Sequence, residues 1–336
     1  MQIKAARREP PNKARNPYAA TFCYSVSACY HAMPNNRRPR SETRPLPNGA
    51  AGDALETASM ANPSVTVRSE SGDPVQLSDL RPVACEPLAR IGGRNDGGYV
   101  VPLDAVTAAK ALLSFGLSHD WTFERDFKRR NAGAIVHCYD HTVGFLTALA
   151  YSAGQLLRAI VRLDAGHLRK AFTWADYLLF FRADRIHFKQ RLWRDRDGIS
   201  VTIDDAFGRL PRGTPTKGTP TFVKMDIEGS EYRVLDGLLR HAPDIVALVI
   251  EFHDVDIAAG LFNSSVERIK RDFHIVHIHG NNLGGVAPFH FPIAPEITFL
   301  NKRFFSSVPP PSARKYPVPE LDSPNYPGFP DFVFEF

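Results

Sequence analysis

The chain has 336 residues, of which 43% are hydrophobic, so it is long enough to bury a sizeable core in one large α/β domain with appendages. No apolar run reaches the roughly 18 to 20 residues that a membrane-spanning helix needs, and we therefore expect a soluble protein without a transmembrane segment. The formal net charge of +5 lies in residues 1–59, with nine basic against four acidic residues, while the remainder holds 32 of each. A neutral remainder argues against a nucleic-acid groove in the globular part.

Residues 1–59 are rich in Pro, Arg, Asn, Ala and Ser and show no sustained periodicity, so we expect a disordered basic tail. Met60 is an alternative start of the protein. The four cysteines, at positions 23, 29, 85 and 138, have neither C-x-x-C pairing nor zinc-ligand spacing. Reduced, incidental thiols are typical of a cytoplasmic protein.

From residue 111 onward, strand-like and helix-like patterns alternate, which predicts an α/β fold with a mostly parallel, doubly wound sheet. The expected strands are 111–117, 134–139, 186–188, 221–227, 245–252, 274–279 and 296–300. An apolar and aromatic stretch at about 143–185 predicts a helical insertion, with a lid over the substrate or a membrane-surface contact as alternatives. The expected organisation is thus a tail (1–59), a main domain (60–308) and a Pro-rich C-terminal extension (309–336).

The segment 221–239, TFVKMDIEGSEYRVLDGLL, is the most informative part of the chain. It predicts a buried strand, then a tight turn at Gly229, then an amphipathic helix for which Ser230 is a candidate cap. Asp226 and Glu228 follow the strand directly. Because ligands of open α/β sheets bind beyond the carboxyl ends of the strands, these carboxylates are candidates for chemistry.

Two positions upstream have the spacing of a nucleotide-type cofactor site. Gly116 follows the first expected strand of the sheet, where the absence of a side chain lets a ligand approach the backbone. Asp140 ends the next strand, and its carboxylate can accept hydrogen bonds from both hydroxyls of a ribose. The competing interpretations are a plain turn glycine and an aspartate that caps a turn. We favour the ribose role for Asp140.

Further polar residues are expected at the same edge, on the side of the later strands. A histidine there is a natural general base near neutral pH, and His253 and His279 are the candidates, together with Asp226 as a catalytic carboxylate. A divalent metal held by Asp226, Glu228, Glu251 and His253 is the alternative, but no local metal signature demands it, so we expect none. The remaining substrate-binding candidates are Glu251, Asn281 and Asn282.

Four motifs in a fixed order carry a family resemblance. They are DGGYVV (96–101), LSFGLSHDWTFERDF (113–127), KMDIEGSEY (224–232) and HIHGNNLGG (277–285). In this order they resemble the FkbM-type S-adenosylmethionine-dependent methyltransferases, from about residue 91 to 285. The resemblance implies a class I methyltransferase sheet of about seven strands with the last strand antiparallel. It also implies S-adenosylmethionine as the cofactor, with Asp96, Gly97, Gly98 and Asp226 beside it.

The sequence therefore predicts an O-methyltransferase acting on a hydroxyl of a sugar or secondary metabolite, with a small-molecule or glycan acceptor and no nucleic acid. Two alternatives remain open. One is a non-catalytic protein that binds S-adenosylmethionine. The other is a nucleic-acid methyltransferase that holds its substrate with the basic tail. The pattern does not fix an oligomeric state.

Overall fold

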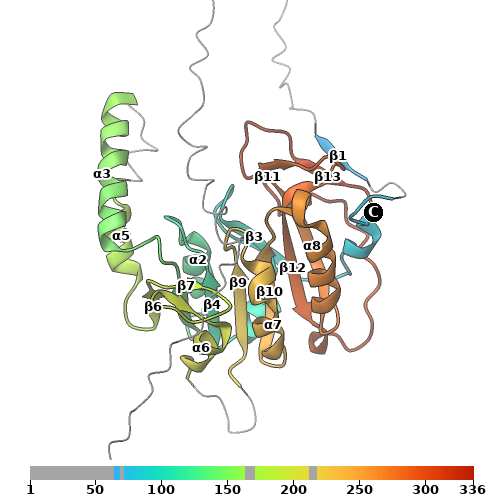
Figure 1. Ribbon diagram of the computed structural model, residues 1–336, viewed down its shortest axis with the longest axis horizontal. Helices are drawn as coiled ribbons and strands as arrows, with labels where there is room; N and C mark the ends of the chain where they lie inside the picture. Colours follow the sequence, from blue (N-terminus) through green and yellow to red (C-terminus); the bar gives the residue numbers. More distant parts are fainter. Residues whose placement is uncertain (1–63, 69–71, 163–170, 212–217) are drawn as a thin grey trace, which may run out of the picture. The chain divides into compact units, whose positions relative to one another are not determined.

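The computed structural model describes residues 64–68, 72–162, 171–211 and 218–336, all within the unit Ser59–Phe336 (Figure 1). The expected basic tail lies outside the described residues. The central sheet has seven strands in the order β11-β12-β10-β9-β4-β5-β6. In chain order they are β4 (Ala111–Phe115), β5 (Ile135–Tyr139), β6 (Arg185–Phe188), β9 (Thr221–Met225), β10 (Ile245–Glu251), β11 (Phe273–Val286) and β12 (Pro292–Asn301).

The strand directions confirm the predicted fold class. Neighbouring strands from β6 to β10 are parallel, whereas β12 is antiparallel to both β10 and β11. The last strand of the sheet therefore inserts between its fifth and sixth strands. All seven expected strands are present, and β11 and β12 are longer than predicted because they pair with each other beyond the rest of the sheet.

Helices cover both faces of this sheet, and each face has its own hydrophobic core. One face packs against α6 (Ile203–Gly208), α7 (Glu231–Arg240) and α8 (Val255–Ile269), and the other against α1 (Leu103–Ala108), α2 (Thr122–Arg130) and α5 (Thr173–Phe180). The alternation of a strand decides which core a side chain joins: Leu112 belongs to one and Leu113 to the other. The doubly wound arrangement follows from strands that are apolar on both faces.

The predicted helical insertion contains α3 (Phe145–Arg162) and α5, which pack against each other. Ser152 on α3 accepts a hydrogen bond from the Trp174 amide of α5 at 3.1 Å. Figure 1 shows this helix pair beyond β6, at the opposite edge of the sheet from β11.

Three small strand pairs were not predicted. A hairpin joins β2 (Leu88–Gly92) to β3 (Gly98–Pro102), β7 (Arg191–Leu192) pairs with β8 (Ser200–Val201), and β1 (Val65–Val67) pairs with β13 (Phe332–Phe334). The last pair attaches the C-terminal residues to the domain. The Phe332 ring packs over Gly280 of β11, where an added Cβ would lie 2.6 Å from the ring. Glycine at this position thus allows the C-terminal segment to approach β11.

The turn between β9 and α7 is held differently from our expectation. Ser230 occupies the N-cap position of α7, but its side chain makes no capping hydrogen bond. The Glu231 carboxylate instead accepts a hydrogen bond from the Ile227 amide at 3.0 Å. Glu228 and Gly229 both have positive φ, of 55° and 87°. This tight turn directs the residues after β9 toward the end of β10.

Candidate active site

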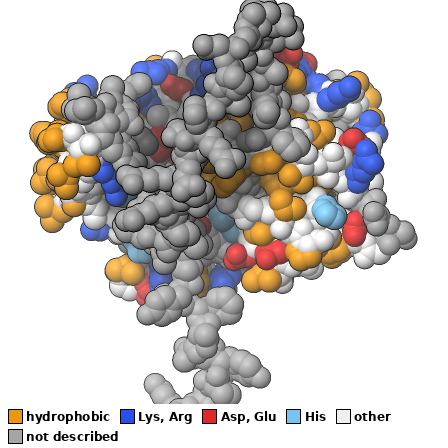
Figure 2. Space-filling model, turned by 90° about the horizontal axis from the view of Figure 1, so that it is seen from above, with side chains coloured by type: hydrophobic (Ala, Val, Ile, Leu, Met, Phe, Trp, Pro, Cys, Tyr) orange, Lys and Arg blue, Asp and Glu red, His pale blue; other side chains and the backbone are white. Residues whose placement is uncertain are grey.

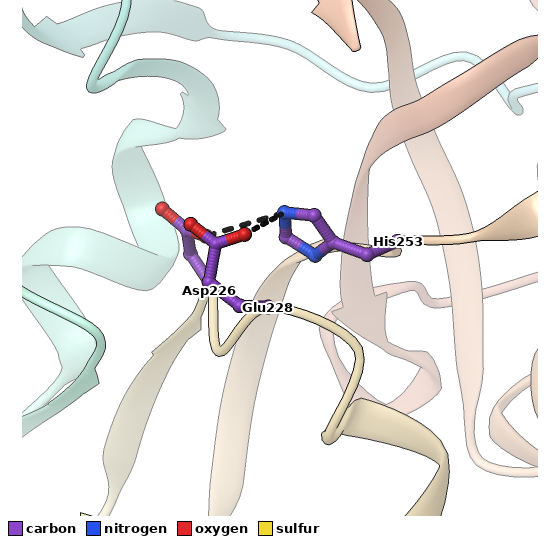
Figure 3. Close-up of side chains that lie close together, drawn as sticks. All are labelled: Asp226, Glu228 and His253. Atoms are coloured by element: carbon purple, nitrogen blue, oxygen red, sulfur yellow. Dashed lines mark ion pairs between the residues drawn. The ribbon is translucent and has the colours of Figure 1, made fainter. Parts of the chain in front are cut away.

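Three side chains from the ends of β9 and β10 face one another at the carboxyl edge of the sheet. His253 Nε2 lies 3.7 Å from Asp226 Oδ1 and 3.7 Å from Glu228 Oε2. Figure 3 shows both carboxylates directed at this nitrogen. The His253 and Asp226 side chains are partly buried, whereas that of Glu228 is 71% exposed. The site is therefore open to solvent on the Glu228 side.

Glu231 holds the His253 ring in this orientation. The buried Glu231 Oε1 lies 3.0 Å from His253 Nδ1, and the Tyr232 hydroxyl donates to the His253 carbonyl at 2.7 Å. Because a carboxylate can only accept, Nδ1 carries the proton of this bond, and Nε2 is the nitrogen left for chemistry. The ring is thus fixed by the turn that follows β9.

Charge around the ring changes its titration. Burial lowers the pKa of His253, but the hydrogen bond that its ring donates to Glu231 and the charges of Glu231, Glu251 and Asp226 outweigh burial and raise the pKa well above its usual value. The same surroundings suit a cation. One ligand atom each from Asp226, Glu228 and His253 lies within 4.8 Å of the others, so these three residues could also hold a divalent metal.

Glu251 lies beneath this cluster, fully enclosed. It accepts hydrogen bonds from the Tyr99 hydroxyl at 3.1 Å and from the Asn281 amide at 2.7 Å. Burial and the negative charge of Asp226 raise its pKa well above the usual value for a carboxyl group. The structure thus brings the predicted residues Glu251 and Asn281 together behind Asp226, where they are buried rather than facing solvent.

Lys224 and Glu124 are buried charged residues that our sequence reasoning missed. Lys224 Nζ donates to the Gly116 carbonyl at 2.8 Å, and the Glu124 carboxyl accepts from the Ser114 hydroxyl at 2.5 Å. The charges of Glu124, Asp226 and Glu251 raise the pKa of Lys224 against the effect of burial. Lys224 is the first residue of the KMDIEGSEY motif, which was the available signal. It ties the turn after β4 to the end of β9.

Asp140 lies where it was predicted, at the end of β5, but its carboxylate is fully engaged. Oδ2 accepts from the Leu117 and Ser118 amides at 2.9 Å each, and Oδ1 accepts from the Thr142 amide at 2.7 Å and the Thr142 hydroxyl at 2.6 Å. Burial raises its pKa, but these hydrogen bonds outweigh burial and lower it. A carboxylate has about four acceptor positions, so ribose hydroxyls would have to displace one of these donors.

Gly116 starts the same turn and has a φ of 81°. A Cβ there would lie 1.6 Å from the Asp226 carbonyl oxygen, so the backbone of Asp226 occupies the space that the missing side chain leaves. This close approach of two strand ends requires glycine. The contact accounts for Gly116 through packing and leaves its predicted cofactor role untested.

The turn between β2 and β3 brings Asp96, Gly97 and Gly98 toward the same edge. Asp96 is exposed as a whole residue, but protein atoms surround its carboxyl group. This burial of the carboxyl group and the nearby charges of Glu296 and Asp226 raise its pKa. Gly97 has a φ of 79° and lies against the Asp120 carboxylate. Asp96 therefore joins Asp120, Asp226 and Glu228 in a group of carboxylates at one end of the sheet.

His279 and Asn282 lie against the C-terminal segment. His279 is 2% exposed and lies between Glu296 (3.1 Å) and Asp331 (3.3 Å), which raise its pKa to about 10 although burial lowers it. The Asn282 amide donates to backbone carbonyls of residues 326–330. These contacts depend on residues far apart in the sequence, which is why the motifs alone did not indicate them.

Residues 199–274 match the methyltransferase FkbM domain. This segment contains Asp226, Glu228, Glu251 and His253, while the other three motifs of the sequence lie outside it. No curated protein matches the chain significantly. No helix among the described residues is both long and apolar enough to span a membrane.

Several solved structures are similar at low sequence identity. The fibrillarin pre-rRNA processing protein of Methanococcus jannaschii is 11% identical over 70% of this chain and 86% of its own, with a TM-score of 0.31. Precorrin-6y C5,15-methyltransferase of Geobacter metallireducens is 9% identical over 60% and 86%, with a TM-score of 0.31. The plantazolicin methyltransferase BpumL in complex with SAH is 8% identical over 59% and 82%, with a TM-score of 0.26.

A doubly wound sheet with an antiparallel strand between its fifth and sixth strands is the class I methyltransferase fold. The family match falls on the strand, turn and helix that build the candidate site. An FkbM methyltransferase domain is found at residues 199–274, and it supports an S-adenosylmethionine-dependent methyltransferase.

Proposed function

We propose that this methyltransferase transfers the methyl group of S-adenosylmethionine to a hydroxyl oxygen of a sugar or secondary metabolite. The observation that supports this most is the His253 ring, with Nδ1 held by Glu231 and Nε2 facing Asp226 and Glu228. An imidazole nitrogen in that position can take the proton of an acceptor hydroxyl. Between the two predicted bases, the contacts favour His253. Both ring nitrogens of His279 lie against carboxylates in the interior, whereas His253 Nε2 lies beside the solvent-exposed Glu228.

The residues at this edge fit the proposed cofactor. S-adenosylmethionine supplies an electrophilic methyl group on a positively charged sulfur, and it also carries an ammonium group. Four carboxylates gather here, those of Asp96, Asp120, Asp226 and Glu228, and none of them is fully buried. Their negative charge suits a cationic ligand. The turn at Gly116 and Asp140 would hold the nucleoside part, on the evidence of its place at the ends of β4 and β5.

The proposed chemistry assigns separate tasks to His253 and Asp226. Neutral Nε2 of His253 accepts the hydroxyl proton, and the Asp226 carboxylate stabilises the imidazolium that forms. The neutral form of His253 increases with pH, and turnover should increase with it. Because the pKa of His253 is raised, this increase should occur at higher pH than for an ordinary histidine. Orientation of the hydroxyl against the methyl group supplies much of the remaining rate.

The same carboxylates argue against a nucleic-acid substrate. A phosphate backbone binds through Lys and Arg and is repelled by acidic side chains. The exposed groups nearest His253 are acidic, with Glu228 at 3.7 Å. A neutral, hydroxyl-rich acceptor meets no such repulsion, which supports a sugar or a small metabolite.

The test is a screen of hydroxyl acceptors with S-adenosylmethionine labelled in its methyl group, alongside calorimetry with S-adenosylhomocysteine. We expect a labelled methyl ether and measurable binding of S-adenosylhomocysteine. Binding without any labelled product across sugar and metabolite acceptors would indicate the non-catalytic cofactor-binding protein instead. Label on nitrogen or carbon would contradict the assignment of oxygen.

A further inference from the structure

The helix pair α3 and α5 exposes more large apolar side chains than any other part of the described chain. On α3 these are Phe145, Leu146, Leu149, Leu156, Leu157, Ile160 and Val161, and around α5 they are Phe172, Leu178 and Leu179. Figure 2 shows hydrophobic side chains gathered at the left of the molecule, the side on which Figure 1 places this pair. Contiguous exposed apolar surface of this kind marks an interaction site.

The arrangement of α3 is the reverse of that of an ordinary surface helix. Its buried side, toward α5, has small or polar residues at Ala148, Ser152, Gln155 and Ala159. Its large apolar residues lie on the outer side instead. A helix of a lone domain turns its apolar face inward, so the outer face of α3 is built to be covered.

The spacing on the outer face specifies what covers it. Leu146, Leu149, Ala153, Leu156 and Ile160 are all exposed and follow one another at intervals of three, four, three and four residues. This is the seven-residue repeat with which one helix packs against another. Over its 18 residues α3 is about 27 Å long, which is enough for such packing.

Charge distinguishes a protein partner from a lipid surface. A helix that lies on an anionic membrane carries several Lys or Arg residues beside its apolar face. α3 has two charged residues, Arg158 and its last residue Arg162, and both positions lie off the repeat. The repeat itself is uncharged, so two identical copies can meet without repulsion, as a two-fold symmetric interface requires.

We propose that the α3–α5 pair is the dimerisation element of this methyltransferase. The outer faces of α3 and α5 from two copies pack against each other and form a four-helix bundle. The proposal is independent of the acceptor, of the base and of the cofactor contacts described above.

The test is the molar mass of the full chain in solution, measured by light scattering during size-exclusion chromatography. We expect twice the mass of one 37.4 kDa chain. The double variant Leu156→Glu/Ile160→Glu should be monomeric, because it places four charges in the bundle. Both side chains are exposed in one copy, at 45% and 64%, so the variant should fold.

The matched control is Ile257→Glu/Leu261→Glu on α8, a second exposed pair with the same spacing, at 72% and 59%. It should remain dimeric. If circular dichroism shows that the first variant is unfolded, Leu146→Lys/Leu149→Lys tests the same face. A monomeric wild-type chain, or a dimer that survives both α3 variants, would overturn the proposal. Sedimentation of a monomeric wild type with phosphatidylglycerol vesicles would assign the face to a membrane instead.

Discussion

The two sides of the carboxyl edge of the sheet use acidic residues in opposite ways. On the β4–β5 side, Asp140 accepts four hydrogen bonds from amides and a hydroxyl, and its pKa is lowered although burial opposes this. On the β9–β10 side, Glu251 accepts from Tyr99 and Asn281 but lies beside Asp226, and its pKa is raised by burial and by that charge. Both residues end a buried parallel strand, so strand position alone does not determine their charge.

The two sides differ in whether their carboxylates are stabilised by donors or repel one another. The β4–β5 side is a satisfied turn, in which the Asp140 carboxylate stabilises the backbone that follows β4 and β5. The β9–β10 side collects Asp226, Glu228 and Glu251 around one histidine, and their repulsion is relieved by a proton or a cation. Groups with shifted pKa values of this kind are typical of catalytic sites.

The largest effect is expected from His253. His253→Ala should lower turnover about a hundredfold or more, because the base is lost, while affinity for S-adenosylhomocysteine stays near normal. Steady-state kinetics and calorimetry measure the two quantities. If His253 acts as the base, EDTA has no effect on the wild type. Complete loss of activity with EDTA, restored by magnesium or manganese, would place Asp226, Glu228 and His253 in a metal shell.

Asp140→Ala should have the next largest effect. It removes charge-assisted hydrogen bonds and should weaken S-adenosylhomocysteine binding by roughly 1.5 to 3 kcal/mol. Thermal denaturation sharpens the comparison. If Asp140 mainly supports the turn, Asp140→Ala lowers the melting temperature together with the affinity for S-adenosylhomocysteine. Asp140→Asn should then lower both by less than Asp140→Ala does. Unchanged affinity would refute the ribose assignment.

Because the pKa of Asp140 is lowered, the stabilisation of the folded protein by its carboxylate is present above pH ~4 and is lost as the pH falls further.

Glu231→Gln should change the pH dependence of turnover. The Glu231 carboxylate is the largest contribution that raises the pKa of His253, and glutamine keeps an acceptor for Nδ1 without the charge. The rising limb of the pH–rate profile should therefore move to lower pH, by about one unit. A limb that does not move would exclude His253 as the titrating base. Arg268, half-buried on α8 and paired with Asp236, offers a control substitution, Arg268→Gln, that should leave the rising limb at the same pH.

Glu251→Gln tests the β9–β10 side through stability. A carboxyl group whose pKa is raised on folding stabilises the protein below its unfolded pKa of about 4.3, and this stabilisation is lost as the pH rises through the folded pKa. Glutamine resembles the protonated form at every pH. The variant should therefore gain stability over the wild type between pH 5 and pH 8, by about 1 kcal/mol or more. Chemical denaturation of both proteins at pH 5 and at pH 8 measures this gain. An equal difference in free energy of unfolding between variant and wild type at the two pH values would contradict the prediction.

The smallest effect is expected from the N-terminal residues. A protein that begins at Met60 should melt and bind S-adenosylhomocysteine like the full chain, because residues 1–59 have too little apolar pattern to build a core. A large fall in melting temperature would show that this segment contributes to folding, and a loss of binding alone would connect it to the site.

The sequence by itself determined the sheet and the edge that carries the site. Short continuous apolar runs and strand-ending acids are local patterns, so they predicted all seven strands of the main sheet and the approach of Asp226, Glu251 and His253. The KMDIEGSEY segment likewise predicted the family. These features depend on residues that are neighbours in the chain or follow from strand order.

The tertiary structure alone determined which of the predicted site residues have their polar atoms occupied by other parts of the protein. The Leu117 and Ser118 donors on Asp140, the pairing of His279 with Asp331 and the contacts of Asn282 with residues 326–330 join parts of the chain that no periodic pattern connects. The stretch that contains α3 was predicted from the sequence as a helical insertion, with a lid or a membrane-surface contact as alternatives. Its exposed repeat was not predicted, because periodicity gives the apolar face of a helix but not the side from which the rest of the chain covers it. Partners, burial and charge depend on long-range packing, and they set the chemistry of the site.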